Sequence, residues 1–419
     1  MNYNKLINYI LNNFSLYNKL RRFVSNKINL NNIKYICDSI GNPQSKFTSI
    51  HIGGTNGKGS TSHSLSSIFQ CSGYSVGLYT SPHLISFRER IKFNGCSISK
   101  DYVLFFLNSY LNLFKELNCS FFEIILSMSF HFFSNKNIDI GIFEVGMGGK
   151  LDTTNIIIPQ LSIITNINLD HVDFLGKNLF SIAYEKSGII KDSIPVIIGR
   201  CDLKLVGFLK NIAKLRNSRI YFSFNKYFYN FLYSNFDFLV FKIFKHNFNY
   251  SNIIFSDLAG YYQIENIVTV INAIDNINNK FNISNKNLIY GLKNIKKLTN
   301  LRCRWEIIKK NPTIIFDVGH NLDSIRFLIN QIEFLYYDKI YIVFGFLLNK
   351  NIFSILKIFP NKVCYYFCKF NNFKMYFNNN LNFKIFHTIK DAFKESQLNA
   401  SKNDLIFVLG GSFLISDIL

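Results

Sequence analysis

The sequence predicts an α/β protein with two domains, of which the first is the larger. The chain has 419 residues, and one hydrophobic core stops growing at roughly 250–300 residues, so two domains are expected. From residue 47 onwards, short β-rich runs alternate with longer helical patterns, which is typical of a mainly parallel sheet covered by helices. A second, shorter alternation follows the Lys- and Asn-rich segment 293–300 and indicates a separate, smaller α/β domain.

Each alternation contains its own candidate core strands. In the first they are residues 47–52, 75–80, 138–144, 160–166 and 194–199, and in the second they are residues 313–317, 339–345, 362–368 and 404–409. Between about residues 201 and 257 the periodicity decays into aromatic and Asn-rich sequence. For this stretch we predict irregular strands and loops, and we assign no chemistry to it.

The composition excludes several classes of protein. The most apolar run, 121–133, contains Glu123 and His131 and falls short of the roughly 18–20 charge-free residues of a membrane helix. Asn and Lys interrupt every apolar run at the N-terminus, so no signal peptide is expected. The eight cysteines form no CxxC pair, which argues against a zinc site or a disulfide framework. We therefore expect a soluble, cytoplasmic protein without a membrane partner.

The net charge of +21 raises the question of a nucleic-acid partner, because a basic surface attracts phosphate backbones. However, Lys, Asn, Ile, Phe and Tyr are abundant along the whole chain, as in proteins from AT-rich genomes, and the lysines form no binding stripe. We expect no nucleic-acid partner. A nucleic-acid-binding protein remains the rival from a different class, and it would lose affinity steeply with rising salt.

A glycine-rich loop follows the strand that ends at residue 52 and precedes a helical pattern. It reads Gly53-Gly54-Thr55-Asn56-Gly57-Lys58-Gly59-Ser60. Glycines let backbone N–H groups approach phosphate oxygens, the helix N-terminus adds positive potential, and Lys58 adds a point charge. The spacing departs from the common GxxxxGK[ST] form, since Gly59 separates Lys58 from Ser60. A plain glycine turn is the alternative, but a turn requires neither a lysine nor four glycines.

Further candidates lie where predicted strands end. Glu144 ends a buried strand just before a glycine-rich turn, and His171 follows the strand 160–166. In an open α/β sheet these positions face the crevice beyond the carboxyl ends of the strands. Asp317 and His320 close a strand of the second alternation in the same way. The alternative is that these side chains only complete loop hydrogen bonds.

Several motifs, in this order and spacing, resemble the folylpolyglutamate synthase/dihydrofolate synthase family of the Mur ligase superfamily. Besides the glycine-rich loop they are Thr80-Ser81-Pro82-His83-Leu84, Glu144-Val145-Gly146-Met147-Gly148-Gly149, Leu151-Asp152-Thr153-Thr154-Asn155, Leu169-Asp170-His171, Glu185-Lys186-Ser187-Gly188, Asp317-Val318-Gly319-His320-Asn321 and Gly410-Gly411-Ser412. The resemblance implies a P-loop domain (1–298), a Rossmann-like ligase domain (299–419) and an active site in the cleft between them.

The resemblance also implies the reaction. Such an enzyme transfers the γ-phosphoryl group of ATP to a pteroate or folate carboxylate, and the amine of L-glutamate then displaces phosphate from the acyl phosphate. Mg²⁺ screens the charge between the two anions. The shared motifs leave open whether the enzyme acts on dihydropteroate, on tetrahydrofolate or on both. The family is typically monomeric.

Residue roles carry over from the family by position. The nucleotide would be bound by Thr55, Asn56, Gly57, Lys58, Gly59, Ser60, Asn266, Arg304 and Asp317; Mg²⁺ by Ser81, Glu144 and His171; and the catalytic residues would be Lys58 and Lys186. His320 is added to the catalytic residues because it lies beside Asp317 and Asn321, where it would help to place glutamate or phosphate. The family lysine that matches Lys186 is carbamylated, which turns a cation into a carboxylate-like metal ligand and needs an uncharged amine.

Three of these residues have simpler explanations. Lys186 can be a surface lysine paired with Glu185. Asn266 can be an amide on a helix surface, and Arg304 can be a linker arginine paired with Glu306.

The pteroate site is implied by two segments of the bifunctional family members. They match Ser120, Phe121, Phe122 and Glu123 and, later in the chain, Leu151, Asp152 and Thr153. The two phenylalanines offer aromatic faces to a pterin ring, and Asp152 can accept its N–H groups. Equally, Phe121 and Phe122 can belong to the core of so aromatic a chain.

Some positions depart from the family pattern. Lys150 replaces the usual arginine, Cys303 replaces a common glycine, and Asn349-Lys350-Asn351 stands where the family has Asp-Lys-Asp. The main rival enzyme is a cell-wall Mur ligase acting on a UDP-muramyl precursor. Such enzymes usually carry a substrate-binding domain before the P-loop, and only 52 residues precede Gly53 here.

Overall fold

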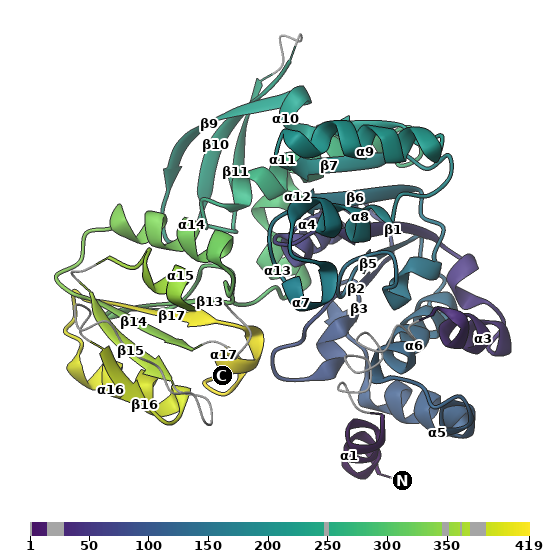
Figure 1. Ribbon diagram of the computed structural model, residues 1–419, viewed down its shortest axis with the longest axis horizontal. Helices are drawn as coiled ribbons and strands as arrows, with labels where there is room; N and C mark the ends of the chain where they lie inside the picture. Colours follow the sequence, from purple (N-terminus) through teal and green to yellow (C-terminus); the bar gives the residue numbers. More distant parts are fainter. Residues whose placement is uncertain (1, 15–28, 247–250, 346–351, 361–362, 369–382) are drawn as a thin grey trace.

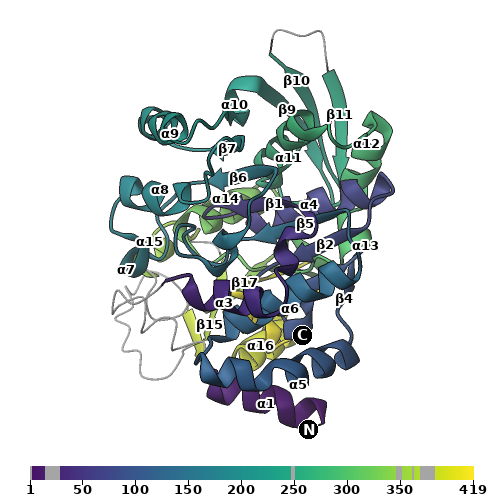
Figure 2. The same cartoon turned by 90° about the vertical axis from the view of Figure 1, so that its right-hand side faces the viewer.

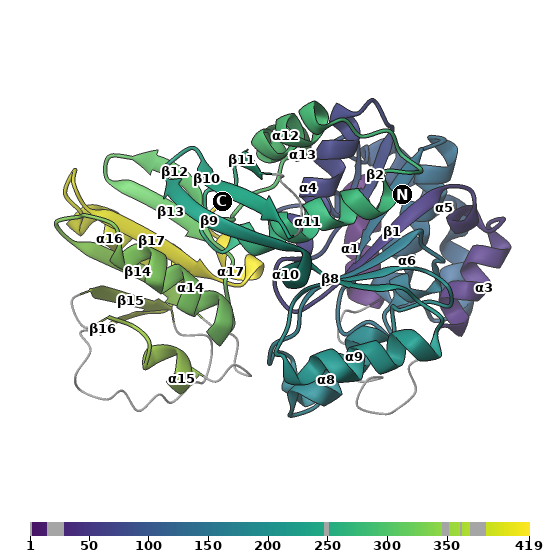
Figure 3. The same ribbon diagram turned by 90° about the horizontal axis from the view of Figure 1, so that it is seen from above.

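The computed structural model describes residues 2–14, 29–246, 251–345, 352–360, 363–368 and 383–419. Two α/β domains lie side by side, the first in purple through teal to green and the second in lighter green to yellow (Figure 1). Seen from above, the two sheets lie in separate domains, and α14 (Leu322–Glu333) lies on the second domain (Figure 3). The prediction of two α/β domains is therefore confirmed.

The first domain is built on an eight-stranded sheet with the order β4-β3-β2-β5-β1-β6-β7-β8. Its strands are β1 (Thr48–Gly53), β2 (Val76–Tyr79), β3 (Ile91–Phe93), β4 (Cys96–Ser97), β5 (Ile140–Glu144), β6 (Leu161–Asn166), β7 (Val196–Arg200) and β8 (Ile220–Phe222). The six strands from β2 to β8 in this order run parallel, and β3 and β4 form an antiparallel edge. The five predicted strands are confirmed to within a few residues, whereas the β3–β4 hairpin and the edge strand β8 were missed.

Helices cover both faces of this sheet because its strands are apolar on both sides. They are α1 (Tyr3–Asn13), α3 (Asn31–Ser39), α4 (Lys58–Cys71), α5 (Lys100–Glu116), α6 (Phe121–Asn135), α7 (Val172–Leu175), α8 (Leu179–Ser187), α9 (Lys204–Leu215), α10 (Ser223–Lys226), α11 (Gln263–Ile277), α12 (Asn285–Lys293) and α13 (Ile295–Thr299). Helices α4, α11 and α12 share one core with β1, β2, β5 and β6. Helices α1, α3, α5 and α6 share another, and α1 lies along α5 at the far end of the domain (Figure 2).

Residues 201–257 are more regular than the sequence indicated. They contain α9 and a three-stranded antiparallel sheet formed by β9 (Tyr227–Ser234), β10 (Leu239–Lys245) and β11 (Ser251–Ser256). The prediction of irregular strands and loops was wrong for this stretch. Aromatic side chains occupy the exposed face as well as the buried one, for example Phe228, which stacks on Phe244, so the apolar–polar alternation of a half-buried strand is lost.

The second domain has a six-stranded sheet with the order β12-β13-β17-β14-β15-β16. Its strands are β12 (Glu306–Lys310), β13 (Thr313–Asp317), β14 (Ile340–Gly345), β15 (Cys364–Cys368), β16 (Phe383–Phe386) and β17 (Leu405–Gly410). Helices α14 and α15 (Ile352–Leu356) cover one face, and α16 (Ile389–Asn399) and α17 (Ser412–Ser416) cover the other. This doubly covered, mainly parallel sheet confirms the Rossmann-like prediction, although β12 and β16 were missed.

The boundary between residues 298 and 299 stays a prediction. Helix α13 spans it and packs on α4, while the second sheet begins at Glu306. The replaced aspartates at Asn349 and Asn351 lie outside the described residues. No helix in the described part of the chain is long and apolar enough to cross a bilayer.

Candidate active site

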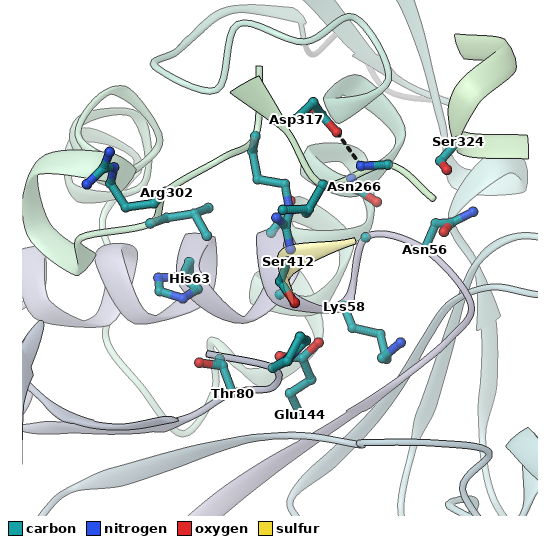
Figure 4. A pocket seen from close by; sticks show the side chains of 18 of the residues that line it. Asn56, Lys58, His63, Thr80, Glu144, Asn266, Arg302, Asp317, Ser324 and Ser412 are labelled. Atoms are coloured by element: carbon teal, nitrogen blue, oxygen red, sulfur yellow. Dashed lines mark hydrogen bonds between the residues drawn. The ribbon is translucent and has the colours of Figure 1, made fainter. Parts of the chain in front are cut away.

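A cleft of about 420 Å³ separates the two domains. The first domain lines it with the phosphate loop, the segment after β2, Glu144 and the start of α11. The second domain lines it with the linker around Arg304, the turn after β13 and the start of α14. Figure 4 shows Asn56 and Lys58 of the loop, Glu144, Asn266 and Asp317 around this space. Most of the predicted nucleotide and metal residues therefore meet in one place.

The phosphate loop has the backbone that its glycines allow. Gly54 and Gly57 adopt φ values of +141° and +81°. A Cβ atom at Gly54 would lie 1.9 Å from Thr165 Oγ1, and one at Gly57 would lie 2.0 Å from Asn266 Oδ1. Helix α4 begins at Lys58 without a side-chain cap, so its first N–H groups face the cleft as an anion site would require. The loop thus fits the phosphates of a nucleotide.

Replacement of Gly57 by alanine tests this geometry. We expect Gly57→Ala to lower nucleotide affinity by more than about tenfold, because the new methyl group displaces Asn266 and strains the loop. Calorimetric titration with ADP measures the effect. Gly73→Ala is the matched control, since Gly73 has a φ of +88° but nothing within 4 Å of the added atom. Equal ADP affinities of the two variants would contradict the assignment.

Glu144 and Ser81 lie together on the sheet side of the cleft. The Ser81 backbone N–H donates to Glu144 Oε2 at 2.9 Å, and the Glu144 side chain is buried. Burial raises the pKa of Glu144, whereas Lys58, the Ser81 N–H and Arg304 act in the opposite direction. A carboxylate and a hydroxyl are the hard oxygen donors that Mg²⁺ prefers, so this pair fits the implied metal.

His171 does not join this pair. It is exposed, has a φ of +50°, begins α7 and does not line the cleft. Within the described residues no group of three or more His, Cys, Asp or Glu side chains could hold a metal ion. The structure therefore brings two of the three predicted metal ligands together, and the role of His171 stays a prediction.

Lys186 is buried rather than exposed. Its Nζ donates to the Gly54 carbonyl at 2.8 Å, beneath the phosphate loop. Burial and the nearby Lys58 lower its pKa to about 7. The alternative of a surface lysine paired with Glu185 is therefore wrong. The side chain thereby approaches the condition that carbamylation sets, because a large fraction of the amine is uncharged near neutral pH.

The nucleotide side of the cleft is built by Asn266, Arg304 and Asp317. Asn266 Nδ2 donates to Gln263 Oε1 at 2.8 Å, and the Asn266 side chain is buried against Gly57, so it is not a helix-surface amide. Glu306 pairs with Arg302, which leaves Arg304 directed toward the cleft near Gly59. The alternative of an Arg304–Glu306 ion pair is therefore wrong.

Asp317 holds the linker in place from the end of β13. Its Oδ2 accepts hydrogen bonds from Tyr262 Oη at 2.5 Å and from the Trp305 N–H at 2.8 Å, and its Oδ1 accepts from the Gly319 N–H at 2.8 Å. Burial raises the pKa of Asp317, and these donors together with Arg304 oppose the rise. Asp317 therefore joins the second domain to α11 through Tyr262.

His320 lines the cleft on the second-domain side. Its Nδ1 lies 3.0 Å from the Val318 carbonyl, and its Nε2 lies 3.7 Å from Asp170 Oδ2. The imidazole is thus oriented by its own turn and faces a carboxylate of the first domain. This position allows contact with a substrate in the cleft.

The seven predicted pteroate residues do not line the cleft. Ser120 and Glu123 make the capping box of α6, with Glu123 Oε2 accepting from Ser120 Oγ at 2.7 Å. Asp152 accepts hydrogen bonds from Thr154 and from the Met147 N–H. These residues have structural roles, and their contact with a pterin stays a prediction.

Two arginines of this region were missed. The guanidinium of Arg90 lies 5.6 Å and 5.7 Å from the ring centroids of Phe121 and Phe122, and its Nε donates to His83 Nδ1 at 2.8 Å. Arg200 lines the cleft from the end of β7. Residues at the carboxyl end of a strand in an open α/β sheet face the crevice, which is the reason Glu144 was selected. The same reasoning applies to Arg200 and would have identified it. Arg90 carries no such local signal.

A phosphate loop at the carboxyl edge of a parallel sheet, faced by a second α/β domain across a cleft, defines a two-domain P-loop enzyme of the Mur ligase class. In agreement, the Mur ligase middle domain matches residues 52–274, and the Mur ligase glutamate ligase domain matches residues 303–412. The chain belongs to the dihydrofolate synthase/folylpolyglutamate synthase family of these ATP-dependent ligases.

Similar proteins support the assignment of the chain to this family. A dihydrofolate synthase/folylpolyglutamate synthase of Buchnera aphidicola (subsp. Schizaphis graminum) is 32% identical over 93% of this chain and 92% of its own length. A folylpolyglutamate synthase of Lacticaseibacillus casei is 29% identical over 75% and 74%. Among solved structures, the apo form of the L. casei enzyme matches with a TM-score of 0.84 at 25% identity, covering 100% of this chain and 98% of the other.

Proposed function

We propose that this protein adds L-glutamate to dihydropteroate, to tetrahydrofolate or to both, with ATP and Mg²⁺, through an acyl phosphate. The observation that carries the proposal is the cleft itself, in which the phosphate loop, the Glu144–Ser81 pair and the second-domain residues Arg304 and His320 face one space. The relatives named above support the choice of glutamate and folate as substrates. A solved Escherichia coli FolC structure with bound DHPP and ADP has the same fold, with a TM-score of 0.80 at 23% identity over 92% of this chain and 91% of the other.

Each residue has a defined part in this reaction. The N–H groups of the phosphate loop and Lys58 hold the phosphates, and Arg304 approaches them from the second domain. Glu144 and Ser81 would hold Mg²⁺, which would supply the positive charge that screens the acceptor carboxylate from the γ-phosphate. His171 and a carbamylated Lys186 complete the proposed metal environment, and His320 places glutamate or phosphate.

The proposal includes the remaining expectations for this enzyme. It is a cytoplasmic monomer with domains at 1–298 and 299–419, its partners are small molecules, and it binds no nucleic acid. The pterin lies against Phe121 and Phe122. A Mur-type ligase of UDP-muramyl precursors is the alternative, and that enzyme would share the phosphate loop but not the acceptor.

Phosphate release tests the proposal. Purified protein with ATP, Mg²⁺ and L-glutamate is compared with 7,8-dihydropteroate, tetrahydrofolate or a UDP-muramyl peptide as acceptor. We expect release with at least one pterin and none with the muramyl substrate. Release with both pterins means a bifunctional enzyme. Release with the muramyl substrate alone would overturn the folate assignment.

A further inference from the structure

The phosphate loop is joined to the second domain by a pair of side-chain amides. Asn56 Nδ2 donates to Asn321 Oδ1 at 3.2 Å, and Asn321 Nδ2 donates back to Asn56 Oδ1 at 2.7 Å. Asn321 Oδ1 also accepts from the Ser324 N–H at 3.0 Å and thereby caps α14. Figure 4 shows Asn56 beneath Ser324 at this junction. One residue of the loop is therefore paired with the residue that begins α14, directly after His320.

Asp323, in the first turn of α14, accepts hydrogen bonds from three separate segments of the first domain. The donors are Asn56 Nδ2 at 3.2 Å, Asn168 Nδ2 at 2.9 Å and Arg200 Nη2 at 2.9 Å. They come from the phosphate loop, the segment after β6 and the end of β7. The Asp323 carboxylate therefore links three segments at the active-site edge of the first sheet to the second domain by hydrogen bonds.

Arg200 forms ion pairs with carboxylates of the protein itself, so we do not expect it to bind an anionic substrate. Besides Asp323, its guanidinium pairs with Glu265 at 3.2 Å and lies 5.0 Å from the Phe327 ring centroid. Two carboxylates outweigh its single positive charge, so little attraction for a further anion remains. The side chains of Arg200 and Asp323 are 35% and 24% exposed, which means that solvent screens their attraction only in part.

These bridges stabilise the arrangement in which the two domains meet across the cleft. Asn56 and Asp323 are 267 positions apart, and Arg200 and Asp323 are 123 positions apart, on opposite sides of the cleft. Neither domain depends on them for its own fold, because β7 is paired on both sides within the first sheet and α14 is capped by Asn321. When the domains separate, all of these contacts are lost together.

We propose that Asp323 and Arg200 are positioning residues, which latch the second domain onto the phosphate loop through Asn56 and so bring His320 and Arg304 into register with the bound nucleotide. The latch acts before chemistry and touches no reacting atom. If only a fraction of the molecules is closed at any time, the apparent affinity for the last substrate is reduced to that fraction of its value in the closed state.

The test compares Asp323→Ala, Arg200→Ala and the double variant with wild type. Small-angle X-ray scattering without ligands measures the domain separation, and steady-state phosphate release measures kcat and KM for glutamate. We expect a larger radius of gyration in each variant and a kcat/KM for glutamate lowered by about tenfold. The double variant should be no worse than either single variant, because the first substitution already opens the latch.

Two further variants make the result specific. Asp192→Ala breaks the Arg216–Asp192 ion pair, which lies within the first domain at 3.1 Å, and is expected to change neither readout. Asp323→Asn keeps the shape of the side chain and replaces Asp323→Ala if that variant does not fold. It should open the protein to a smaller degree.

Two outcomes would overturn the proposal. One is a radius of gyration that stays at the wild-type value in all variants. The other is a loss of activity in Arg200→Ala but not in Asp323→Ala, which would mean that Arg200 contacts substrate directly. The kinetic readout rests on the proposed function, whereas the scattering readout does not, so a wrong substrate assignment and a wrong latch are distinguishable.

Discussion

Glu144→Gln is expected to lower kcat/KM for phosphate release by about 100- to 1000-fold, the range found when one preorganised electrostatic contact in an active site is removed. The amide oxygen can still accept the Ser81 N–H that Glu144 Oε2 now accepts at 2.9 Å. What is lost is the negative charge that faces Lys58 and Arg304 and that would bind Mg²⁺. Initial rates measured across a Mg²⁺ titration should show a higher Mg²⁺ requirement as well as a lower maximum.

Glu185→Gln is the matched control for this experiment. Glu185 is a partly buried carboxylate on α8 that does not line the cleft, and burial raises its pKa as it raises that of Glu144. We expect its replacement to change kcat/KM by less than about threefold, since it touches no reacting group. A Glu144→Gln variant that retains wild-type activity and Mg²⁺ dependence would remove Glu144 from the metal site.

Lys186→Ala is expected to lower kcat by about 100-fold or more, a loss similar to that of one metal-stabilised contact. Lys186 holds the Gly54 carbonyl beneath the phosphate loop, and its pKa is lowered from 10.5 to about 7 by burial and by Lys58. Carbon dioxide adds only to the neutral amine, which is the minor form below about pH 7 and the major form above it. Carbamate and activity should therefore rise together as the pH increases through 7.

The carbamate itself is measured by intact mass, native against acidified, with and without added bicarbonate. Lys191→Ala is the control, because burial and Arg216 also lower the pKa of Lys191, to about 8, but its Nζ is bound to the Asn155 carbonyl outside the cleft. Full activity of Lys186→Ala, together with no mass loss on acidification, would exclude the carbamate.

The local parts of this structure could be predicted because neighbouring residues decide them. A short buried strand, a loop of four glycines and a helix start at Lys58 are each specified within a few positions. The β9–β11 sheet escaped prediction because Phe228 and its neighbours make the exposed face apolar too, so the pattern no longer distinguishes inside from outside. The edge strands β12 and β16 were missed as well.

The sequence by itself determined the two α/β domains, the phosphate loop and, through its ordered motifs, the ligase family. Only the tertiary structure decided which side chains meet. Three contacts join segments that lie more than a hundred positions apart in the chain. They are the hydrogen bond of Lys186 to Gly54, the packing of Asn266 against Gly57 and the ion pair of Asp323 with Arg200. Such contacts depend on how the sheets and domains pack, because the strand order β2-β5-β1-β6-β7 brings distant strand ends to one edge, and no local pattern of residues encodes that order.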